Sequence, residues 1–468
     1  MSKSLPGRSM LPISKAQGDR KALLEEAARR AGRYLDELEG RSVFPTPEAL
    51  AGLESFDEPF PAGPQDALET LSLLDNVGSP ATTTSAGGCF FGFVIGGSLP
   101  AALAASVLAT AWDQNAGMVV SSPAAAKLED IALGWLSEVW ALPVGVGGGF
   151  VSGATMANFS GLAAARHALL RQESWDVEAQ GLFGAPPITV MVGEEVHVSL
   201  LKALSLLGLG RERVVRVPVD QQGRMVAQAL SHLSGPTIVC IQAGNVNSGA
   251  FDPTAEICRI AHAARAWVHV DGAFGLWAVA APARVHLTVG VSEADSWATD
   301  AHKWLNVPYD SGLVFCRHTG ELRAALTHSR AAYLAEGDQR EPMEYTPEMS
   351  RRARGVEAWA ALRSLGKSGL AEMVDSCCRH ATSFAEGLAA AGFEILNEVQ
   401  LNQVLVSFGD PQKTQRVIKA VQQDGTCWCG GTVWQGQTAM RISVSSWATT
   451  KTDVERSLEA LLRIAAHA

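Results

Sequence analysis

The sequence predicts an α/β protein built on a mostly parallel β-sheet that helices cover on both faces. Two observations carry this prediction. Between Pro187 and Arg317, short apolar runs typical of buried strands alternate with amphipathic stretches of helical period. Polar residues follow several of these runs directly, at the sheet edge where ligands bind in such folds. The residues after 350 mix shorter helices and strands, which predicts a smaller C-terminal α+β domain.

The composition indicates a large folded chain and argues against several classes of partner. The chain has 468 residues, and 47% of them are hydrophobic, enough for a large core. A formal net charge of -10 argues against nucleic acid and against anionic membrane surfaces. No apolar run is long enough for a signal peptide or a membrane span. The eight cysteines are irregularly spaced, which predicts neither disulfides nor a metal site and favours the cytoplasm.

Residues 1–85 are expected to form an N-terminal helical segment. Within it, residues 21–40 place leucines and alanines on one side at helical spacing, and residues 41–80 are rich in proline and aspartate. Such a layer cannot bury its apolar side alone, so we expect it to pack on a partner subunit. The large domain is then predicted over 86–345 and the small domain over 346–468.

The stretch 86–100, AGGCFFGFVIGGSLP, opens the large domain with paired glycines and three phenylalanines. Glycines permit close backbone approach, and rings such as Phe91 and Phe93 supply an apolar wall, so this stretch is a candidate substrate pocket. A packed core turn explains the same residues equally well. Helices are expected next, over 100–117 and 123–142.

Residues 145–158 contain a glycine run followed by Ala154 and Thr155 at the start of an alanine-rich helix. Free backbone N–H groups and a hydroxyl at a helix start form an anion site that suits a phosphate. The glycine run does not open a strand-turn-helix unit with dinucleotide spacing, so a nicotinamide cofactor is not expected. Taken alone, the motif could equally be an ordinary helix start.

The alternation that follows gives the remaining elements. Strands are expected over 188–193, 212–219, 237–243, 266–270 and 294–299, with helices over 197–206, 225–233 and 253–264. In the small domain, helices are expected over 367–391, 413–423 and 452–466, and strands over 393–396, 403–407 and 440–444.

Three polar residues follow strands of the large domain: His197, Asp271 and Lys303. A lysine at the end of a buried strand is costly to desolvate, so its ammonium should be paired or consumed by chemistry, as in a Schiff base. Each residue also has a plainer interpretation, as a structural histidine, a capping aspartate or a lysine that reaches solvent.

The conjunction of these residues with a phosphate-binding helix start predicts a pyridoxal 5'-phosphate site. Asp271 would keep the pyridine nitrogen protonated, because a nearby carboxylate stabilises the cationic ring. His197 would lie on one face of the ring and Ala273 on the other. Lys303 would hold the cofactor as an internal aldimine until an amino substrate displaces it.

These motifs resemble the group II pyridoxal-phosphate-dependent amino-acid decarboxylases, a family of the fold type I, aspartate-aminotransferase-like enzymes that includes aromatic-amino-acid and glutamate decarboxylases. The most specific matches are HVDGAFG at 269–275 and DAHKW at 300–304, supported by SGATMAN at 152–158 and EEVHVS at 194–199. The resemblance implies a homodimer with shared active sites. It also implies roles in cofactor binding for Ala154, Thr155, His197, Asp271, His302 and Lys303.

Two positions depart from the family pattern. Asn247 stands in a segment where many members carry threonines, and Asp300 stands where several carry asparagine. A carboxylate beside a phosphate would repel it unless the carboxylate caps the loop, so Asp300 is left out of the predicted site.

The activity that the resemblance implies is decarboxylation of an L-amino acid to the amine and carbon dioxide, through an external aldimine and a quinonoid. Phe91 and Phe93 favour a substrate with an aromatic or apolar side chain. These residues include no additional cation, which argues against a dicarboxylic substrate. An aldehyde synthase or aminotransferase on the same scaffold is the first alternative. A catalytically silent binding homologue is the second.

Residues 318–350 are polar and lie where family members carry a mobile catalytic loop, near 325–350, with a tyrosine proton donor. Tyr333 and Tyr345 are the candidates, and Tyr345 is preferred because its surroundings look more exposed. Arg441 matches an arginine that binds a substrate carboxylate in transaminases. In a decarboxylase the substrate carboxylate must leave as carbon dioxide, so an arginine should not hold it. We therefore expect Arg441 to be structural.

Overall fold

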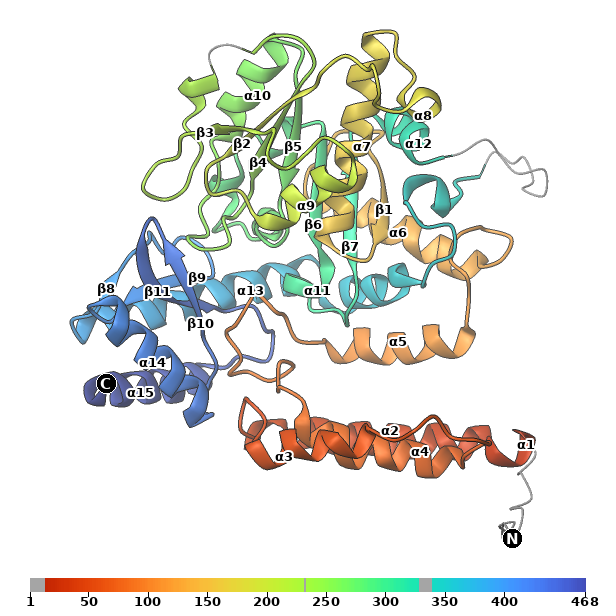
Figure 1. The fold of residues 1–468 in the computed structure, drawn as a ribbon, viewed down its shortest axis with the longest axis vertical. Helices are drawn as coiled ribbons and strands as arrows, with labels where there is room; N and C mark the ends of the chain where they lie inside the picture. Colours follow the sequence, from red (N-terminus) through yellow and green to blue (C-terminus); the bar gives the residue numbers. More distant parts are fainter. Residues whose placement is uncertain (1–12, 231–232, 328–338) are drawn as a thin grey trace, which may run out of the picture.

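The computed structural model describes residues 13–230, 233–327 and 339–468. Its central feature is a seven-stranded sheet in the order β1-β7-β6-β5-β4-β2-β3 (Figure 1). Strands β2 to β6 pair in parallel, whereas β7 runs antiparallel to β6 and to β1. The predicted mostly parallel sheet is therefore confirmed. The strands are β1 (Gly147–Val151), β2 (Thr189–Gly193), β3 (Val215–Val217), β4 (Thr237–Gln242), β5 (Trp267–Asp271), β6 (Ser296–Asp300) and β7 (Gly312–Cys316).

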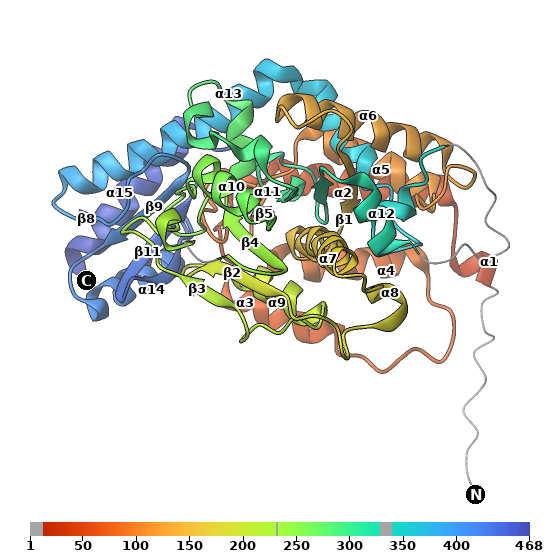
Figure 2. The ribbon, with the colours of Figure 1, turned by 90° about the horizontal axis from the view of Figure 1, so that it is seen from above.

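Helices cover both faces of this sheet (Figure 2). Successive residues of β4 point to opposite faces of the sheet, and both faces are apolar and need cover. Ile238 and Cys240 belong to one apolar cluster, and Val239 and Ile241 belong to another on the opposite face. The first cluster includes residues of α7 (Ala154–Gln172), α9 (Val198–Leu206) and α12 (Thr319–Leu326). The second includes residues of α6 (Pro123–Val139), α10 (Thr254–Ala263) and α13 (Arg354–Ala390).

A second, four-stranded sheet lies in the C-terminal part of the chain, with strand order β10-β11-β9-β8 and antiparallel pairing throughout. Its strands are β8 (Glu394–Ile395), β9 (Gln403–Ser407), β10 (Gly430–Trp434) and β11 (Gln437–Ser443), and its helices are α14 (Pro411–Asp424) and α15 (Lys451–His467). Helix α13 packs on α5 (Pro100–Trp112) and α6 at one end and on α15 and β9 at the other. It is continuous except at Gly366, whose φ is 60°.

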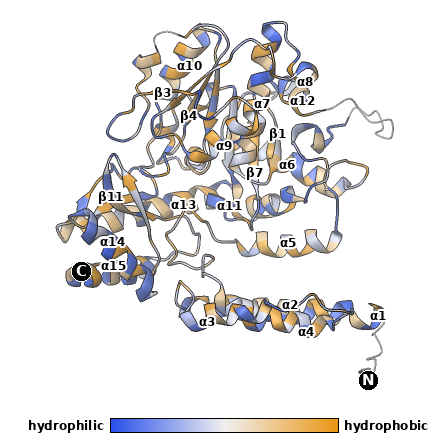
Figure 3. Ribbon diagram, in the orientation of Figure 1, coloured by the Kyte–Doolittle hydropathy of each residue, from blue (hydrophilic) through white to orange (hydrophobic). Residues whose placement is uncertain are grey.

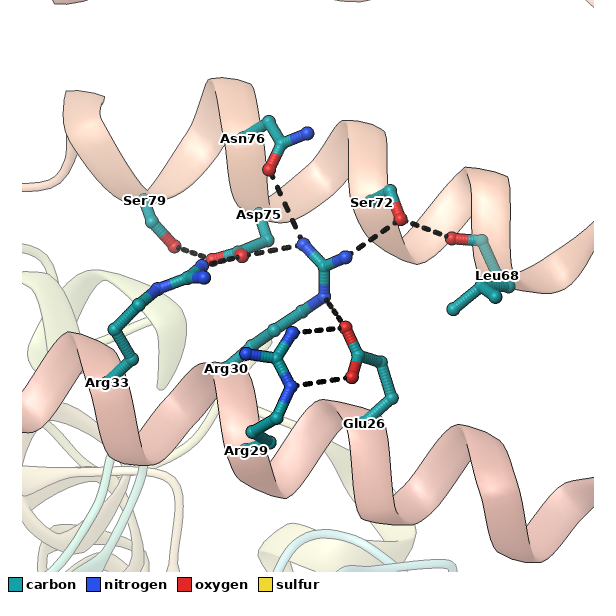
Figure 4. Close-up of polar contacts among 9 residues, drawn as sticks. All are labelled: Glu26, Arg29, Arg30, Arg33, Leu68, Ser72, Asp75, Asn76 and Ser79. Atoms are coloured by element: carbon teal, nitrogen blue, oxygen red, sulfur yellow. Dashed lines mark hydrogen bonds and ion pairs between the residues drawn. The ribbon is translucent and has the colours of Figure 1, made fainter.

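The N-terminal helices form a layer apart from the sheets, at the bottom of Figure 1. They are α1 (Ile13–Ala16), α2 (Arg20–Asp36), α3 (Pro47–Gly52) and α4 (Ala67–Leu73). Asp75, just after α4, forms ion pairs with Arg30 at 2.8 Å and with Arg33 at 2.5 Å (Figure 4). Both arginines lie in α2, so these pairs tie the segment after α4 to α2. Apolar residues such as Leu24 and Leu68 stay exposed, and Figure 3 shows apolar segments along these helices. Packing on a partner remains a prediction.

The elements differ from expectation in several places, including β10, which no expected strand covers. Strand β1 forms from the glycine run, and it escapes sequence patterns because Gly147 to Gly149 carry no side chains. A Cβ on Gly148 would lie 2.6 Å from the carbonyl oxygen of Val314, so glycine permits this pairing. Among the described residues of the expected helix over 225–233, Ala227–Leu230 form a 3₁₀ turn, and α12 lies in the stretch expected to be a loop. The remaining short helices are α8 (Val177–Gln180) and α11 (Ala301–Trp304).

The glycine-rich stretch 86–100 packs directly against the loop that carries Lys303. A Cβ on Gly96 would lie 1.9 Å from the carbonyl oxygen of Lys303, and the N–H of Gly97 donates to Asn306 Oδ1 at 2.7 Å. Asn306 also accepts from the N–H of Trp447 at 3.0 Å and donates to the carbonyl oxygen of Ser445 at 3.1 Å. One buried amide therefore ties two distant segments to the lysine loop.

No helix of the described residues is both long enough and apolar enough to cross a membrane.

Gly96→Ala should displace the lysine loop, because its Cβ would overlap the backbone of Lys303. We expect a loss of about 1–3 kcal/mol in the free energy of unfolding, measured by denaturant titration. Gly134→Ala is the matched control, because it lies inside α6 with nothing within 4 Å of the new Cβ. It should leave stability unchanged or raise it by up to about 1 kcal/mol. Equal stability of the two variants would contradict the packing described.

Candidate active site

Lys303 lies in α11, immediately after β6, and its side chain is largely buried. Its Nζ lies 2.8 Å from Oδ2 of Asp300, whose side chain is 3% exposed. The structure therefore pairs the ammonium, as its desolvation requires. Asp300 was left out of the predicted site, and the structure places it in direct contact with the lysine.

The start of α7 meets the same carboxylate. Asp300 Oδ1 accepts a hydrogen bond from the N–H of Ala154 at 2.6 Å. Gly312 makes this approach possible, since a Cβ there would lie 2.5 Å from Cα of Gly153. His302 borders the same place: a Cβ on Gly153 would lie 3.4 Å from its Cε1. The helix start offers an N–H donor suited to an anion, and in this structure the carboxylate of Asp300 takes it beside His302.

His302 is held by the turn that follows the lysine loop. Its Nδ1 accepts from the N–H of Ser311 at 3.1 Å, which directs Nε2 toward Asp300 Oδ1, 3.7 Å away. Burial lowers the pKa of His302, partly opposed by the charge of Asp300. The ring of Tyr309 lies against it, with the two ring centroids 4.3 Å apart.

Asp271 ends β5 and is buried. Its Oδ2 accepts from Asn158 Nδ2 at 3.1 Å, and its Oδ1 accepts from the N–H of Ala273 at 3.3 Å. Burial raises the pKa of Asp271, while the charges of His197 and Lys303 act in the opposite direction. All three strand-end residues predicted from the sequence are therefore close enough to affect one another electrostatically.

A chain of buried hydrogen bonds runs through Trp267, Ser296, His269 and Asn158 and ends at Asp271. The Trp267 indole donates to Ser296 Oγ at 2.9 Å, and Ser296 Oγ lies 2.8 Å from His269 Nδ1. His269 Nε2 lies 2.8 Å from Asn158 Oδ1. An ionised carboxylate can only accept, so the Asn158 nitrogen faces Asp271 and the Asn158 oxygen accepts from His269 Nε2. The neutral ring then accepts at Nδ1 from the Ser296 hydroxyl, which in turn accepts from the indole.

This chain holds the Asn158 amide in place, because its nitrogen donates to Asp271 and its oxygen accepts from His269. Burial lowers the pKa of His269 to about 3, so its ring is neutral at neutral pH. The four residues behind Asp271 therefore present an N–H donor to the carboxylate, and such a donor favours its ionised form.

His197 caps the N-terminus of α9. Its Nδ1 accepts from the N–H of Ser199 at 3.3 Å and lies 2.7 Å from the Ser199 hydroxyl oxygen. Burial lowers the pKa of His197, with a partial offset from the charge of Asp271. The ring is thus a neutral, flat surface whose orientation the helix fixes.

These residues fit the predicted cofactor. The start of α7 supplies backbone N–H groups for a phosphate, Asp271 supplies a buried carboxylate for a pyridinium, and Lys303 supplies an amine for an aldehyde. The Ser311 hydroxyl beside this site is buried and has no hydrogen-bond partner among the described residues. Thr155 follows Ala154 in the first turn of α7, with its side chain partly buried.

Three other predicted residues lie elsewhere. Phe91 has no exposed surface and packs on Phe384, so the structure places it in the core rather than on a pocket wall. Phe93 is 61% exposed and stacks on Trp428 with ring centroids 5.2 Å apart. The expectation that Tyr345 is exposed is wrong.

Tyr345 is 7% exposed, and the guanidinium of Arg340 lies 4.5 Å from the centre of its ring. Tyr333 lies outside the described residues.

Sequence reasoning missed Asn158, Asn306 and Tyr309. Asn158 stands in the quoted motif SGATMAN, and its spacing of one helical turn from Ala154 was an available signal. Asn306 has a φ of 55°, which asparagine tolerates better than most residues, but its partners lie about 140 to 210 positions away in sequence. Tyr309 carried no signal of its own.

Comparison with known proteins extends this description. A family model described as the pyridoxal-dependent decarboxylase conserved domain matches residues 52–409. Tryptophan decarboxylase 1 of Oryza sativa subsp. japonica is 27% identical over 483 aligned residues, covering 94% of this chain and 92% of that protein. Aspartate 1-decarboxylase of Aliivibrio fischeri is 29% identical, covering 74% of this chain and 68% of that protein.

Solved structures share the fold. The crystal structure of Oryza sativa TDC with PLP and tryptamine has a TM-score of 0.89 at 23% identity, covering 99% of both chains. The crystal structure of Rhodiola rosea 4-hydroxyphenylacetaldehyde synthase has a TM-score of 0.83 at 23% identity, covering 96% of this chain and 99% of that one. This chain belongs to the pyridoxal-dependent decarboxylase family and is a carboxy-lyase whose cofactor is pyridoxal 5'-phosphate, as its motifs predicted.

Proposed function

We propose that this protein decarboxylates an L-amino acid with an aromatic or apolar side chain, giving the amine and carbon dioxide. The observation that carries the proposal is the grouping of Lys303, Asp271 and His197 with the start of α7 at one edge of the sheet. These are the parts that a lysine-bound pyridoxal phosphate needs.

Each residue has a distinct task in this proposal. Ala154, Thr155 and His302 hold the phosphate, and Lys303 binds the aldehyde carbon. Asp271 keeps the pyridine nitrogen protonated, and the Asn158 donor behind it keeps that carboxylate ionised. His197 and Ala273 hold the two faces of the ring. When bound, the cofactor supplies an electron sink for the charge left at Cα as carbon dioxide departs.

The substrate class rests on two supports. Phe93 presents an exposed aromatic face, stacked on Trp428, in the same loop as Gly96, which touches the lysine loop. The relative of known activity that aligns over 94% of this chain is a tryptophan decarboxylase.

A second candidate, decarboxylation of an acidic amino acid, is favoured by Arg441. This arginine is largely buried in β11 and donates to the carbonyl oxygen of Val246 at 3.2 Å and to Asn247 Oδ1 at 3.3 Å. Its charge contributes to lowering the pKa of His197. No carboxylate pairs with it among the described residues, which leaves a cation for an acidic side chain.

We also propose that the protein acts as a homodimer in the cytoplasm, with each active site completed by the partner. The exposed apolar residues of α2 and α4 support a docked N-terminal layer, because a single chain leaves them uncovered. The eight cysteines are all unpaired and buried, which suits a reducing compartment.

The activity is tested with purified protein, pyridoxal phosphate and a panel of amino acids. We expect amine and carbon dioxide in equal amounts from tryptophan or phenylalanine. Lys303→Ala should lose the visible absorption band of the lysine-bound cofactor and lower turnover by about a hundredfold or more. Lys202→Ala, an exposed lysine of α9, is the control and should change neither. An aldehyde, ammonia or keto acid as product would refute decarboxylation to the amine.

Arg441→Gln separates the two substrate classes. Loss of a charge-assisted hydrogen bond to an acidic side chain should raise KM for aspartate or glutamate by about 10- to 100-fold, whereas KM for tryptophan should stay within about twofold. Comparing both substrates in one variant cancels general damage to the fold. Efficient turnover of aspartate in the wild type, with the large KM increase in the variant, would favour the second candidate over the first.

Ser296→Ala interrupts the hydrogen-bond chain behind Asp271. It leaves the Trp267 indole and His269 Nδ1 without their partner, so the free energy of unfolding should fall by about 1–3 kcal/mol. Cofactor retention during dialysis should weaken as well. Ser205→Ala removes an exposed serine of α9 and should change stability by less than about 0.5 kcal/mol. Equal stability and equal cofactor retention in Ser296→Ala and Ser205→Ala would show that the hydrogen-bond chain does not support Asp271.

A further inference from the structure

The carboxylate of Asp300 accepts from a helix N–H that the proposed function assigns to the cofactor phosphate. Its Oδ1 lies 2.6 Å from the N–H of Ala154, the first residue of the 19-residue helix α7. A helix N-terminus attracts anions through its unpaired N–H groups and its dipole. In this structure, a side chain of the protein itself supplies that anion.

The same carboxylate neutralises the lysine. Asp300 Oδ2 lies 2.8 Å from Lys303 Nζ, and Asp300 Oδ1 lies 3.7 Å from His302 Nε2. The side chains of Asp300 and Lys303 are 3% and 19% exposed, so each would be costly to bury alone. Asp300 therefore contacts both groups that the cofactor must reach: the N–H groups of α7 through its phosphate and the lysine through its aldehyde.

The backbone of Asp300 cannot move to make room. Its N–H donates to the carbonyl oxygen of Ala273 at 2.9 Å, and its own carbonyl oxygen accepts from the Trp277 indole at 3.0 Å. It also pairs with Gly312 in the β6–β7 ladder. Only rotation of the side chain can withdraw the carboxylate from the helix start.

We propose that Asp300 is an internal anion that competes with the cofactor phosphate for the start of α7, so that cofactor binding must displace it. The proposal rests on the roles assigned above to α7 and Lys303. It makes Asp300 a residue that stabilises the cofactor-free protein and weakens its affinity for the phosphorylated cofactor. An asparagine of the same shape would keep a hydrogen-bond acceptor there without the competing charge.

The experiment compares two ligands that differ only in the phosphate. Cofactor-free wild type and Asp300→Asn are titrated with pyridoxal 5'-phosphate and with pyridoxal, and dissociation constants are measured by tryptophan fluorescence. We expect Asp300→Asn to bind the phosphorylated ligand about tenfold more tightly relative to pyridoxal. Inorganic phosphate should also raise the Tm of cofactor-free Asp300→Asn more than that of the wild type.

Asp310→Asn is the matched control. Asp310 lies in the same loop, but its side chain is 42% exposed and pairs with Arg354, so its substitution should leave the ratio of the two dissociation constants unchanged. Asp300→Ser provides a second variant if the asparagine protein does not fold.

An unchanged or lower preference for the phosphorylated ligand in the Asp300 variants would overturn the proposal. A wrong assignment of the cofactor site would give a different result: wild type and Lys303→Ala would then show the same visible spectrum with pyridoxal phosphate.

Discussion

The buried contact between Lys303 and Asp300 is the constraint on which the rest of the site depends. An ammonium removed from water needs a partner of opposite charge, and the 2.8 Å pair supplies it at the end of a strand inside the sheet. The loop that carries Lys303 must also be held in place by contacts with other segments of the chain. Asn306 does this by joining the glycine-rich stretch and the segment after β11 to the loop.

The charges of the site are few, and each is set by its surroundings. His197, His269 and His302 are all held toward the neutral form by burial. Asp271 receives a donor whose direction is fixed by four residues behind it. The polar groups left for chemistry are Lys303 and the two aspartates, buried where electrostatic interactions are stronger than in water. The charge of Arg441 contributes to lowering the pKa of His197, and its role in selecting a substrate is part of the proposal above.

Much of the fold was predictable because strand periodicity and strand-end polar residues are local signals. The parallel strands β2, β4, β5 and β6 were predictable from their apolar runs. Lys303, Asp271 and His197 stood out as candidates because each lies at the end of such a run or shortly after it. Strand β1 was not predictable, because glycines leave no side-chain pattern and its pairing with β7 joins residues about 165 positions apart. The burial of Phe91 and Tyr345 could not be foreseen, since it depends on residues distant in sequence: Phe91 packs on Phe384, and Tyr345 belongs to an apolar cluster with residues of β1 and α7.

The attachment of the cofactor to Lys303 is the claim that supports every other assignment. It can be tested most directly by reducing the cofactor-loaded protein with borohydride, digesting it and locating the added mass by mass spectrometry. The account predicts the modification on the peptide that contains Lys303, in the wild type and in Asp300→Asn alike. Modification of a different lysine, with Lys303 unmodified, would contradict it.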